Sequence, residues 1–416
     1  MKRFFLIALL AIIAFVSIRT GVFYYQNLRG ARPAFLPAPQ DITEMFGTVV
    51  PSPGSEKTDG DIVQSVPAVN TTDFPLVLPN GFSVSIFAEN LGKPRVIARD
   101  PAGIILVSDQ SGGSVFALPD ADHDGAADRL VRVVGNLNLP HGLAFHPETR
   151  DLYVAETDKV VAYRYDPDSM TASSSRTAVD LPSGGNHVTR TIGFGPDGKL
   201  YIAVGSTCNV CVEKDWRRTK ILVANTDGSN LREFASGLRN AVFFTWHPVT
   251  REIWATEMGR DLLGDNLPPE EIDIVKEGRN YGWPYCYGNR VHDGNFDTSG
   301  GKKAFCETTE PPHITFQAHS APLGLAFVPD TWPREYRGDL LVSYHGSWNR
   351  SQPTGYKVVR FDLDDQGNSR GESDFLSGWL TDGGALGRPV DLMFDNAGSL
   401  YISDDKAGVV YRVTPP

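Results

Sequence analysis

The feature that most constrains the fold of this chain is a strand, turn, strand unit that recurs along it. Each copy has an apolar strand, a turn usually marked by Pro or Gly, and a second apolar strand ending in small or polar residues. "IGFGPDGKLYIAVGS" is one copy. The six copies begin at Val96, Gly142, Ile192, Phe243, Gly324 and Asp391. The first three are spaced by roughly 50 residues, as propeller blades are.

Further short strand candidates lie between the copies, among them "KVVAYRYD", "KILVANTD" and "KVVRFDL". They are enough to make each unit a four-stranded sheet, so we predict an all-β fold, a six-bladed β-propeller of four-stranded antiparallel blades. Wider gaps after Met258 and Pro329 leave room for insertions. An early strand, "FSVSIFAE" from Phe82, is expected to complete the last blade beside "GVVYRV" and close the ring.

The N-terminus has the composition of an export signal. Lys2 and Arg3 precede an apolar run over residues 4–18, and no clear small-residue cleavage site follows. Residues 1–29 are therefore either a cleaved signal peptide or an uncleaved membrane anchor, although the run is short for a full span. We expect a periplasmic or extracellular protein, which an uncleaved N-terminal segment would hold at the inner membrane. Residues 30–74, rich in Pro, Ser and Thr, are expected to be a flexible linker before a propeller domain over residues 75–416.

Charge and cysteine content narrow the function further. The formal net charge of -11 argues against nucleic acid as a partner, because phosphate binding relies on clustered Lys and Arg. "CNVC" is not followed by a His, and no second close pair of cysteines completes a metal set. In an exported protein disulfides are favoured. We expect Cys208 to pair with Cys211, and Cys286 with Cys306.

Three polar residues precede strands of successive copies. His187 ends a Gly-Gly-Asn loop before one copy, and Arg239 and Asn240 stand at the matching point before the next. Taken singly, each has an ordinary structural explanation: a hydrogen-bonded loop histidine, a surface salt bridge and a turn asparagine. Because blade-entry loops meet at one face of a ring, the three together indicate a site.

Several longer motifs make the chain resemble the quinoprotein sugar dehydrogenases, which use pyrroloquinoline quinone (PQQ). The motifs are "NHVTRTIGFGPDGKLYIAVGS", "GLRN", "EIDIVKEGRNYGWPYC" and "GRPVDLMFDNAGSLYISDD". The resemblance covers roughly residues 78–413, and "VGSTCNVC" and "HGSWNR" make the sorbosone-type branch look closest. It implies an oxidoreductase that takes a hydride from an aldose or sugar aldehyde, with PQQ and Ca²⁺ as cofactors and a separate electron acceptor.

The resemblance also implies roles for individual residues. His187 matches the general base that takes the proton from the sugar hydroxyl. Arg239 and Asn240 match residues beside the quinone oxygens, where fixed positive charge stabilises the developing anion. The backbone carbonyls of Gly259 and Arg260 match those that hold the calcium ion.

The family's residues that bind the cofactor, its carboxylates among them, are matched less completely. Arg388 matches an arginine that pairs with one of the carboxylates. A second arginine of the family is here Val390, and an Asp beside the base is here Ser206. The family's lysine under the cofactor is missing, with Arg350 as a substitute and His345 as a weaker one.

The residues alone suggest two further calcium sites but do not decide either of them. "DADHDGAAD" places Asp120, Asp122 and Asp124 at alternate positions before a Gly, the pattern of a calcium loop, but Val131 stands where a Glu would complete it. A structural calcium and a plain acidic turn are both consistent with this pattern. Glu271, beside the "NYGWP" string, either belongs to a second calcium site or is solvated.

Two alternatives to a dehydrogenase remain on the sequence. One is a propeller of the same fold that binds a glycan or protein partner without turnover, because a fold does not fix a function. The other is a calcium-dependent sugar lactonase, which gathers carboxylates around its metal. The central candidates here are His, Arg and backbone groups, which counts against a lactonase.

Overall fold

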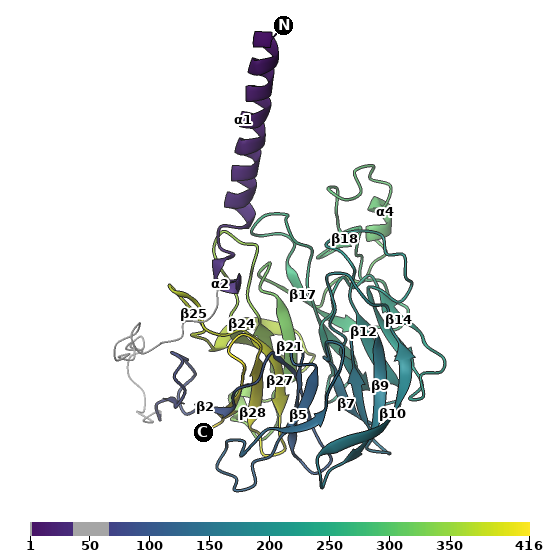
Figure 1. The fold of residues 1–416 in the computed structure, drawn as a ribbon, viewed down its shortest axis with the longest axis vertical. Coiled ribbons are helices and arrows are strands. Elements are labelled where there is room, and N and C mark those ends of the chain that lie inside the picture. The colour runs from purple at the N-terminus through teal and green to yellow at the C-terminus, as the bar shows by residue number, and fades with distance from the viewer. Residues whose placement is uncertain (1, 36–65) are drawn as a thin grey trace.

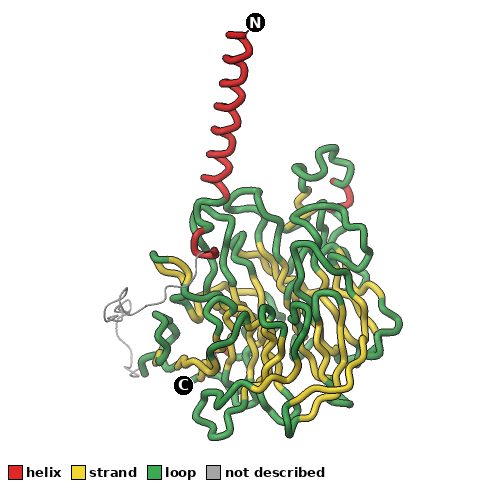
Figure 2. The backbone as a smooth tube through the Cα atoms, in the orientation of Figure 1, coloured by secondary structure: helices red, strands yellow, loops and turns green. Residues whose placement is uncertain are grey.

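Short β-strands make up most of the regular structure in the computed structural model, which describes residues 2–35 and 66–416 (Figures 1 and 2). Six sheets of four or five strands are arranged around a central axis, so the six-bladed propeller is confirmed. Among the described residues, two small sheets lie outside the blades, β18 (Cys286–Tyr287) with β19 (Val291–His292) and β25 (Leu380–Thr381) with β26 (Gly384–Ala385). Blade 1 contains β3 (Pro94–Arg99), β4 (Ile105–Asp109), β5 (Ser114–Leu118) and β6 (Val131–Val134). Blade 2 contains β7 (Leu143–Phe145), β8 (Leu152–Ala155), β9 (Lys159–Asp166) and β10 (Thr171–Asp180).

The remaining blades repeat this plan. Blade 3 contains β11 (Ile192–Phe194), β12 (Leu200–Val204), β13 (Lys220–Ala224) and β14 (Arg232–Ser236). Blade 4 contains β15 (Phe243–Trp246), β16 (Ile253–Glu257), β17 (Glu270–Val275) and β20 (Ile314–Phe316). Blade 5 contains β21 (Pro322–Phe327), β22 (Leu340–Tyr344), β23 (Lys357–Leu363) and β24 (Ser369–Leu376).

Blade 6 closes the ring with both ends of the propeller domain. It contains β27 (Pro389–Phe394), β28 (Leu400–Asp404), β29 (Val409–Thr414) and β2 (Ser83–Ala88). The early strand β2 pairs antiparallel with β29, with Val84 opposite Val413, which confirms the predicted closure. The two-residue strand β1 (Val69–Asn70) extends this sheet by pairing with β2.

Hydroxyl groups near the ends of the second strands link neighbouring blades. Ser108 Oγ donates to the carbonyl of His141 in the next blade at 2.8 Å, and Thr256 Oγ1 donates to the carbonyl of Leu323 at 2.7 Å. Ser403 makes the same link from blade 6 to blade 1. In these blades the small polar residues near the end of the second strand therefore satisfy buried backbone carbonyls of the next blade.

The strand directions place all blade-entry loops at one end of the ring. In each blade the first strand is antiparallel to the second, so the loop entering the first strand and the loop leaving the second share an end. We call this end, which carries the loops before β3, β7, β11, β15, β21 and β27, the site face. His187 and Ser206 both lie there, before β11 and after β12.

An insertion between β17 and β20 rises above the site face. It contains the strands β18 (Cys286–Tyr287) and β19 (Val291–His292) and the short helix α4 (Lys303–Cys306). A disulfide joins Cys286 to Cys306 across it, and a second disulfide joins Cys208 to Cys211. Both predicted pairings are confirmed.

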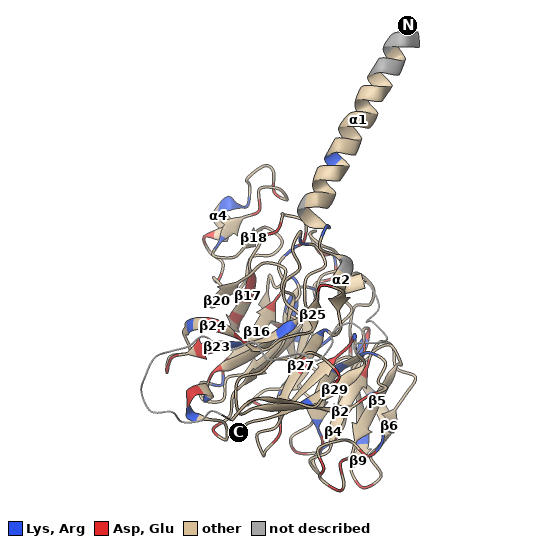
Figure 3. Ribbon diagram, turned by 90° about the vertical axis from the view of Figure 1, so that its left-hand side faces the viewer, with Lys and Arg blue, Asp and Glu red and all other residues tan. Residues whose placement is uncertain are grey.

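The N-terminal residues form a long helix that leaves the same end of the ring (Figure 1). Helix α1 (Lys2–Asn27) has an 18-residue apolar window, Ala8–Tyr25, that is long and apolar enough to cross a membrane. Figure 3 shows few charges along it compared with the propeller. A short helix, α2 (Arg32–Phe35), follows. Residues 36–65, most of the expected linker, lie outside the described residues.

Candidate active site

The ring of His187 is held by the first residues after β12. Its Nδ1 lies 2.9 Å from the carbonyl oxygen and 2.8 Å from Oγ of Ser206. The Ser206 hydroxyl donates its own hydrogen to the carbonyl of Cys208 at 2.7 Å. Because a carbonyl oxygen only accepts, the proton of a neutral ring is assigned to Nδ1. Nε2, which has no hydrogen bond among the described residues, then carries the free lone pair.

Two buried arginines fix the loop that carries His187. Arg190 donates to the carbonyls of His187 at 2.9 Å and Pro182 at 2.8 Å. Arg218 donates to the carbonyls of Pro182, Ser183 and Gly184, on the same loop. Both side chains are almost fully buried. Their charged donors hold backbone acceptors on both sides of the loop, so the position of His187 is determined by packing well beyond its own contacts.

The environment of His187 keeps its ring neutral. Burial, and after it the nearby charge of Arg239, lower the pKa of His187 to about 3. An imidazole whose pKa lies that low is unprotonated throughout the physiological range. The ring therefore offers a lone pair at Nε2 rather than a proton.

We expect NMR spectra of ring-labelled histidine in the PQQ-free protein to show no protonation of His187 between pH 5 and pH 8. The sign follows from the lowered pKa, since the proton binds only as the pH falls toward about 3. A His187→Gln variant assigns the signal. In Ser206→Asp, a carboxylate beside Nδ1 should stabilise the imidazolium and raise the pKa. A midpoint near pH 6.5 in the parent would contradict the prediction.

Arg239 lies next to this histidine and is fully engaged by the protein. Its guanidinium forms an ion pair with Asp261 at 2.9 Å and donates to the Asn209 carbonyl at 2.9 Å and the Gly259 carbonyl at 2.9 Å. Further donors reach Asn209 Oδ1 and the Met258 carbonyl. All five N–H donors of the fork have acceptors, so Arg239 offers a fixed positive charge rather than a free donor.

Asn240 is positioned by its backbone, which leaves its side-chain amide available. The backbone N–H of Asn240 donates to the carboxylate of Glu257 at 3.0 Å. Its Nδ2 reaches only the Met258 sulfur, at 3.6 Å, and sulfur is a weak acceptor. A Cβ on Gly205 would come within 2.5 Å of Asn240 Oδ1 and 2.8 Å of the His187 Cβ. Glycine at this position lets the two side chains approach each other.

The two residues matched to calcium ligands lie against Arg239. The Gly259 N–H donates to Glu270 at 2.9 Å, which fixes the direction of the Gly259 carbonyl beside the arginine. The Arg260 side chain pairs with Asp293 at 2.6 Å. Burial raises the pKa of Glu270 to about 8. The Gly259 carbonyl thus lies at Arg239, and a calcium ion held by the carbonyls of Gly259 and Arg260 stays a prediction.

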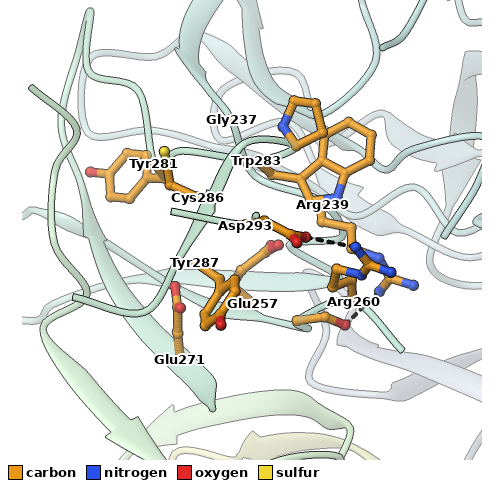
Figure 4. Close-up of a pocket in the computed structure, with 12 residues that line it drawn as sticks. Gly237, Arg239, Glu257, Arg260, Glu271, Tyr281, Trp283, Cys286, Tyr287 and Asp293 are labelled. Carbon is orange, nitrogen blue, oxygen red and sulfur yellow. Dashed lines mark hydrogen bonds and ion pairs between the residues drawn. The ribbon is translucent and has the colours of Figure 1, made fainter. Parts of the chain in front are cut away.

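Glu271 lines a small cavity beneath the insertion (Figure 4). The cavity has a volume of about 20 Å³, room for roughly one water molecule or ion. Glu257 also lines it, and burial raises the pKa of Glu271 to about 7 and that of Glu257 well above its usual range. Both carboxylate oxygens of the neighbouring Asp273 are buried without a hydrogen-bond partner. A cation would offset these buried carboxylates.

Arg388 belongs to a cluster of charged residues at the entry to blades 1 and 6. Its Nε and Nη2 donate to the carbonyls of His345 and Gly346 at 2.9 and 2.6 Å. His345 Nε2 lies 2.8 Å from Asp405, which also pairs with Arg95 at 2.6 Å. Burial lowers the pKa of His345 to about 4, so its ring is neutral. No hydrogen bond of Arg388 Nη1 occurs among the described residues, which leaves that nitrogen for a ligand.

The other residues singled out from the sequence lie elsewhere. Arg350 donates to the carbonyls of Asp265 and Ala318 at the rim of the site face, where it holds loops together. Val390 is fully buried, and its carbonyl accepts from the Ser343 hydroxyl in the link between blades 5 and 6. Its side chain belongs to the hydrophobic core.

The acidic loop after β5 lies at the opposite end of the ring from the site face. Asp120, Asp122 and Asp124 bring their carboxylates within 4.8 Å of one another. Backbone N–H groups of Asp124 and Gly125 donate to the Asp120 carboxylate. The loop is thus shaped by its own hydrogen bonds, and a structural calcium there stays a prediction.

Sequence reasoning missed the residues that support the site. Asp261 follows the motif "EMGR" directly, and Asn209 lies between two cysteines, so both were adjacent to recognised patterns. Arg95 and Asp405 come from the two blades that meet at the ring closure. Their contacts depend on that closure, and no local pattern in the sequence signals them.

Comparisons with known proteins identify the family of the chain. The TrAA12-like family model matches residues 76–416. An uncharacterized protein of Borreliella burgdorferi is 31% identical over 356 residues, covering 81% of this chain and 90% of that protein. A PQQ-dependent pyranose dehydrogenase of Coprinopsis cinerea is 27% identical over 418 residues, covering 84% of this chain but 56% of the enzyme.

The solved structures give the same result for the fold. The holo form of the PQQ domain of the Coprinopsis cinerea pyranose dehydrogenase aligns with a TM-score of 0.72 at 25% identity, covering 84% of this chain and all of that domain. The propeller and its site thus define a quinoprotein-type oxidoreductase scaffold. The chain belongs to the TrAA12-like family of PQQ-dependent oxidoreductases.

Proposed function

We propose that the protein is an exported quinoprotein that oxidises an aldose or a related sugar aldehyde, with PQQ as the hydride acceptor. The observation that carries this proposal is the arrangement of His187, with its free Nε2, beside the fixed charge of Arg239 and the available amide of Asn240. The relatives named as PQQ-dependent pyranose and sugar dehydrogenases support the substrate class.

The residues at the site face fit PQQ, which carries three carboxylates. Arg388 retains a free nitrogen on a buried guanidinium, and the Arg95 charge lies in the same cluster. Lys406 is close enough to Arg388 for each charge to act on the other. These cations would hold the carboxylates, and Asn240 Nδ2 would donate to a quinone oxygen. Bound PQQ supplies an electrophilic carbonyl that accepts a hydride.

His187 would act as the general base toward the sugar. Nε2 accepts the proton of the hydroxyl at the carbon that is oxidised, while Ser206 holds Nδ1–H and so fixes the reactive tautomer. In this chain a serine and a backbone carbonyl orient the base, where the resembling glucose enzymes have an aspartate. The ring thus becomes cationic only during turnover, with Arg239 close by.

Arg239 would stabilise negative charge that develops on the cofactor. Asp261, Asn209 and the Gly259 carbonyl fix its guanidinium in one orientation, so no reorganisation accompanies the reaction. Because all its N–H groups are engaged, its contribution is electrostatic, made through the charge of the whole group.

The carbonyls of Gly259 and Arg260 would hold the calcium ion beside the cofactor. Calcium prefers oxygen ligands, and a carbonyl has two lone pairs, so Gly259 can serve the ion and Arg239 together. A second cation would occupy the cavity at Glu271, beside the Asp273 carboxylate, which is buried without a hydrogen-bond partner. The apolar N-terminal helix and the two disulfides support export.

We expect the purified full-length chain to reduce a dye only when PQQ, Ca²⁺ and a suitable sugar are all present. Exhaustive chelation, with metal loss confirmed, should abolish the rate, and added Ca²⁺ should restore it, because the cation anchors and polarises the cofactor. A panel of aldoses and sugar aldehydes identifies the substrate class. If PQQ binds by absorbance and none of the panel supports dye reduction, the proposal is wrong.

A further inference from the structure

The end of helix α1 is joined to the site face by hydrogen bonds. The Gly264 backbone N–H donates to the side chain of Asn27 at 3.2 Å. The Gly30 N–H donates to the carbonyl of Arg350 at 2.6 Å. These contacts reach two different loops of the site face, the one after β16 and the one after β22. Two attachments to separate loops fix the direction of the helix relative to the propeller.

A continuous series of hydrogen bonds connects this junction to the candidate site. The Gly264 carbonyl accepts from His319 Nε2 at 2.9 Å, and His319 Nδ1 lies 3.2 Å from the side chain of Asn349. Asn349 donates to Asp261 at 2.8 Å, and Asp261 pairs with Arg239. The helix end therefore contacts the same loop that orients Arg239.

The helix itself has the properties of a membrane span. Its 26 residues extend roughly 39 Å, more than the thickness of a bilayer core. No residue of its apolar window is buried within the described part of the protein. Lys2 and Arg3 at its start favour the cytoplasmic side, and Tyr24 and Tyr25 near its end suit the opposite interface.

Only a short stretch of helix follows Arg19, its last charged residue, and this places the site face close to the lipid headgroups. Arg19 is separated from Asn27 by eight residues, or roughly 12 Å of helix. An arginine in a span extends its guanidinium to the interface, so the helix end stands only a short distance outside it. The loops that contact Asn27 are then within reach of the membrane surface.

The site face also exposes large apolar side chains on several loops. They are Val212 and Trp216 after β12, Leu262 and Leu267 after β16, and Val291 in the insertion. A groove of about 720 Å³ lies mainly between the loop after β16 and the helix, where apolar and polar side chains line it together: Phe23, Tyr25, Leu262 and Leu263, with Arg19, Asn27, Asp265, Asn295 and Ser351. Apolar groups gathered at one face around a span match the chemistry of a lipid surface.

We propose that α1 is retained in the mature protein and holds the site face against a phospholipid bilayer, so that the candidate site opens toward the membrane surface. The occupant of the groove beside α1 is then a lipid, with its chain against Phe23 and Leu262 and its headgroup near Arg19. This orientation is a property of the fold and the anchor, and its test needs neither cofactor nor turnover. Its outcome is therefore separate from that of the proposed function.

The test uses the full chain in vesicles of phosphatidylcholine and phosphatidylglycerol. All four native cysteines form disulfides, so one added cysteine can be labelled selectively with a fluorophore. Leu267→Cys places the probe on the site face, and Val249→Cys, in the turn between β15 and β16, is the matched control at the opposite end. Headgroup spin-labelled lipid should quench the first probe several-fold more. Equal quenching would overturn the proposal.

Two further measurements separate a fixed orientation from simple tethering. Asn27→Ala together with Gly30→Ala should reduce the difference between the two probes, because the first removes the acceptor of the Gly264 N–H and the second places a Cβ 2.4 Å from the Arg350 carbonyl oxygen. An unchanged difference would show that the helix contacts do not hold it. The mass of the protein recovered from membranes should include residues 1–27, and a product lacking them would refute retention.

Discussion

His187→Ala should lower kcat by about a hundredfold or more while PQQ still binds, because the variant loses the imidazole nitrogen proposed to accept the proton of the sugar hydroxyl. The loss should appear in turnover, since the ring contacts Ser206 and leaves carboxylate recognition to other residues. The rate of dye reduction at saturating sugar measures it, with bound cofactor followed by absorbance.

A second histidine provides the control for this substitution. His313 Nε2 lies 2.7 Å from the carbonyl oxygen of Gly367, and the His313 ring packs against Trp254. His313 lies between blades 4 and 5, at the opposite end of the ring from the site residues. His313→Ala should leave turnover nearly unchanged. If His187→Ala oxidises the parent's sugar at the parent's rate with cofactor bound, His187 is not the base.

The architecture could be predicted because its signal is local and repeated. A blade needs only alternation of apolar residues and turn residues at regular spacing, and six copies carry this pattern, from Val96 to Asp391. The same reasoning predicted that the strand from Phe82 closes the ring, because the last blade otherwise lacks one of its four strands. Strand direction then brought His187, Arg239 and Asn240 to one face.

The supports of the site could not be found in this way. Arg218 fixes the His187 loop by binding carbonyls more than thirty positions earlier, and nothing near Arg218 signals this. The departure at Val390 has a simple cause, because that side chain is buried in the core and cannot face a ligand. Arg350 was expected under the cofactor, yet its guanidinium joins loops at the rim.

Contacts of the N-terminal helix were equally beyond sequence reasoning. Composition identifies an apolar segment but not what its end touches, and Asn27 lies 237 positions from its partner Gly264. The sequence alone therefore does not decide between a cleaved signal peptide and a membrane anchor. The hydrogen bonds at the helix end connect the helix to the candidate site, because the loop that they reach also carries Asp261.

Arg239→Ala should reduce both PQQ affinity and turnover, with a combined loss in kcat/KM of about a hundredfold to a thousandfold. The variant removes the charge that faces the developing anion, and it frees Asp261 and the Gly259 carbonyl from their shared partner. Both effects act on the cofactor site, so the loss should divide between binding and rate, whereas His187→Ala should affect the rate alone. Equilibrium titration with PQQ and single-turnover kinetics separate the two.

Arg239→Lys distinguishes charge from geometry at the same position. A lysine keeps the positive charge but cannot reach Asn209, Gly259 and Asp261 together, because it lacks the planar fork. If Arg239 acts mainly through its charge, as its fully engaged donors indicate, Arg239→Lys should retain more turnover than Arg239→Ala. Equal losses in both variants, with melting temperatures near that of the parent, would show that the orientation of the fork matters more than its charge.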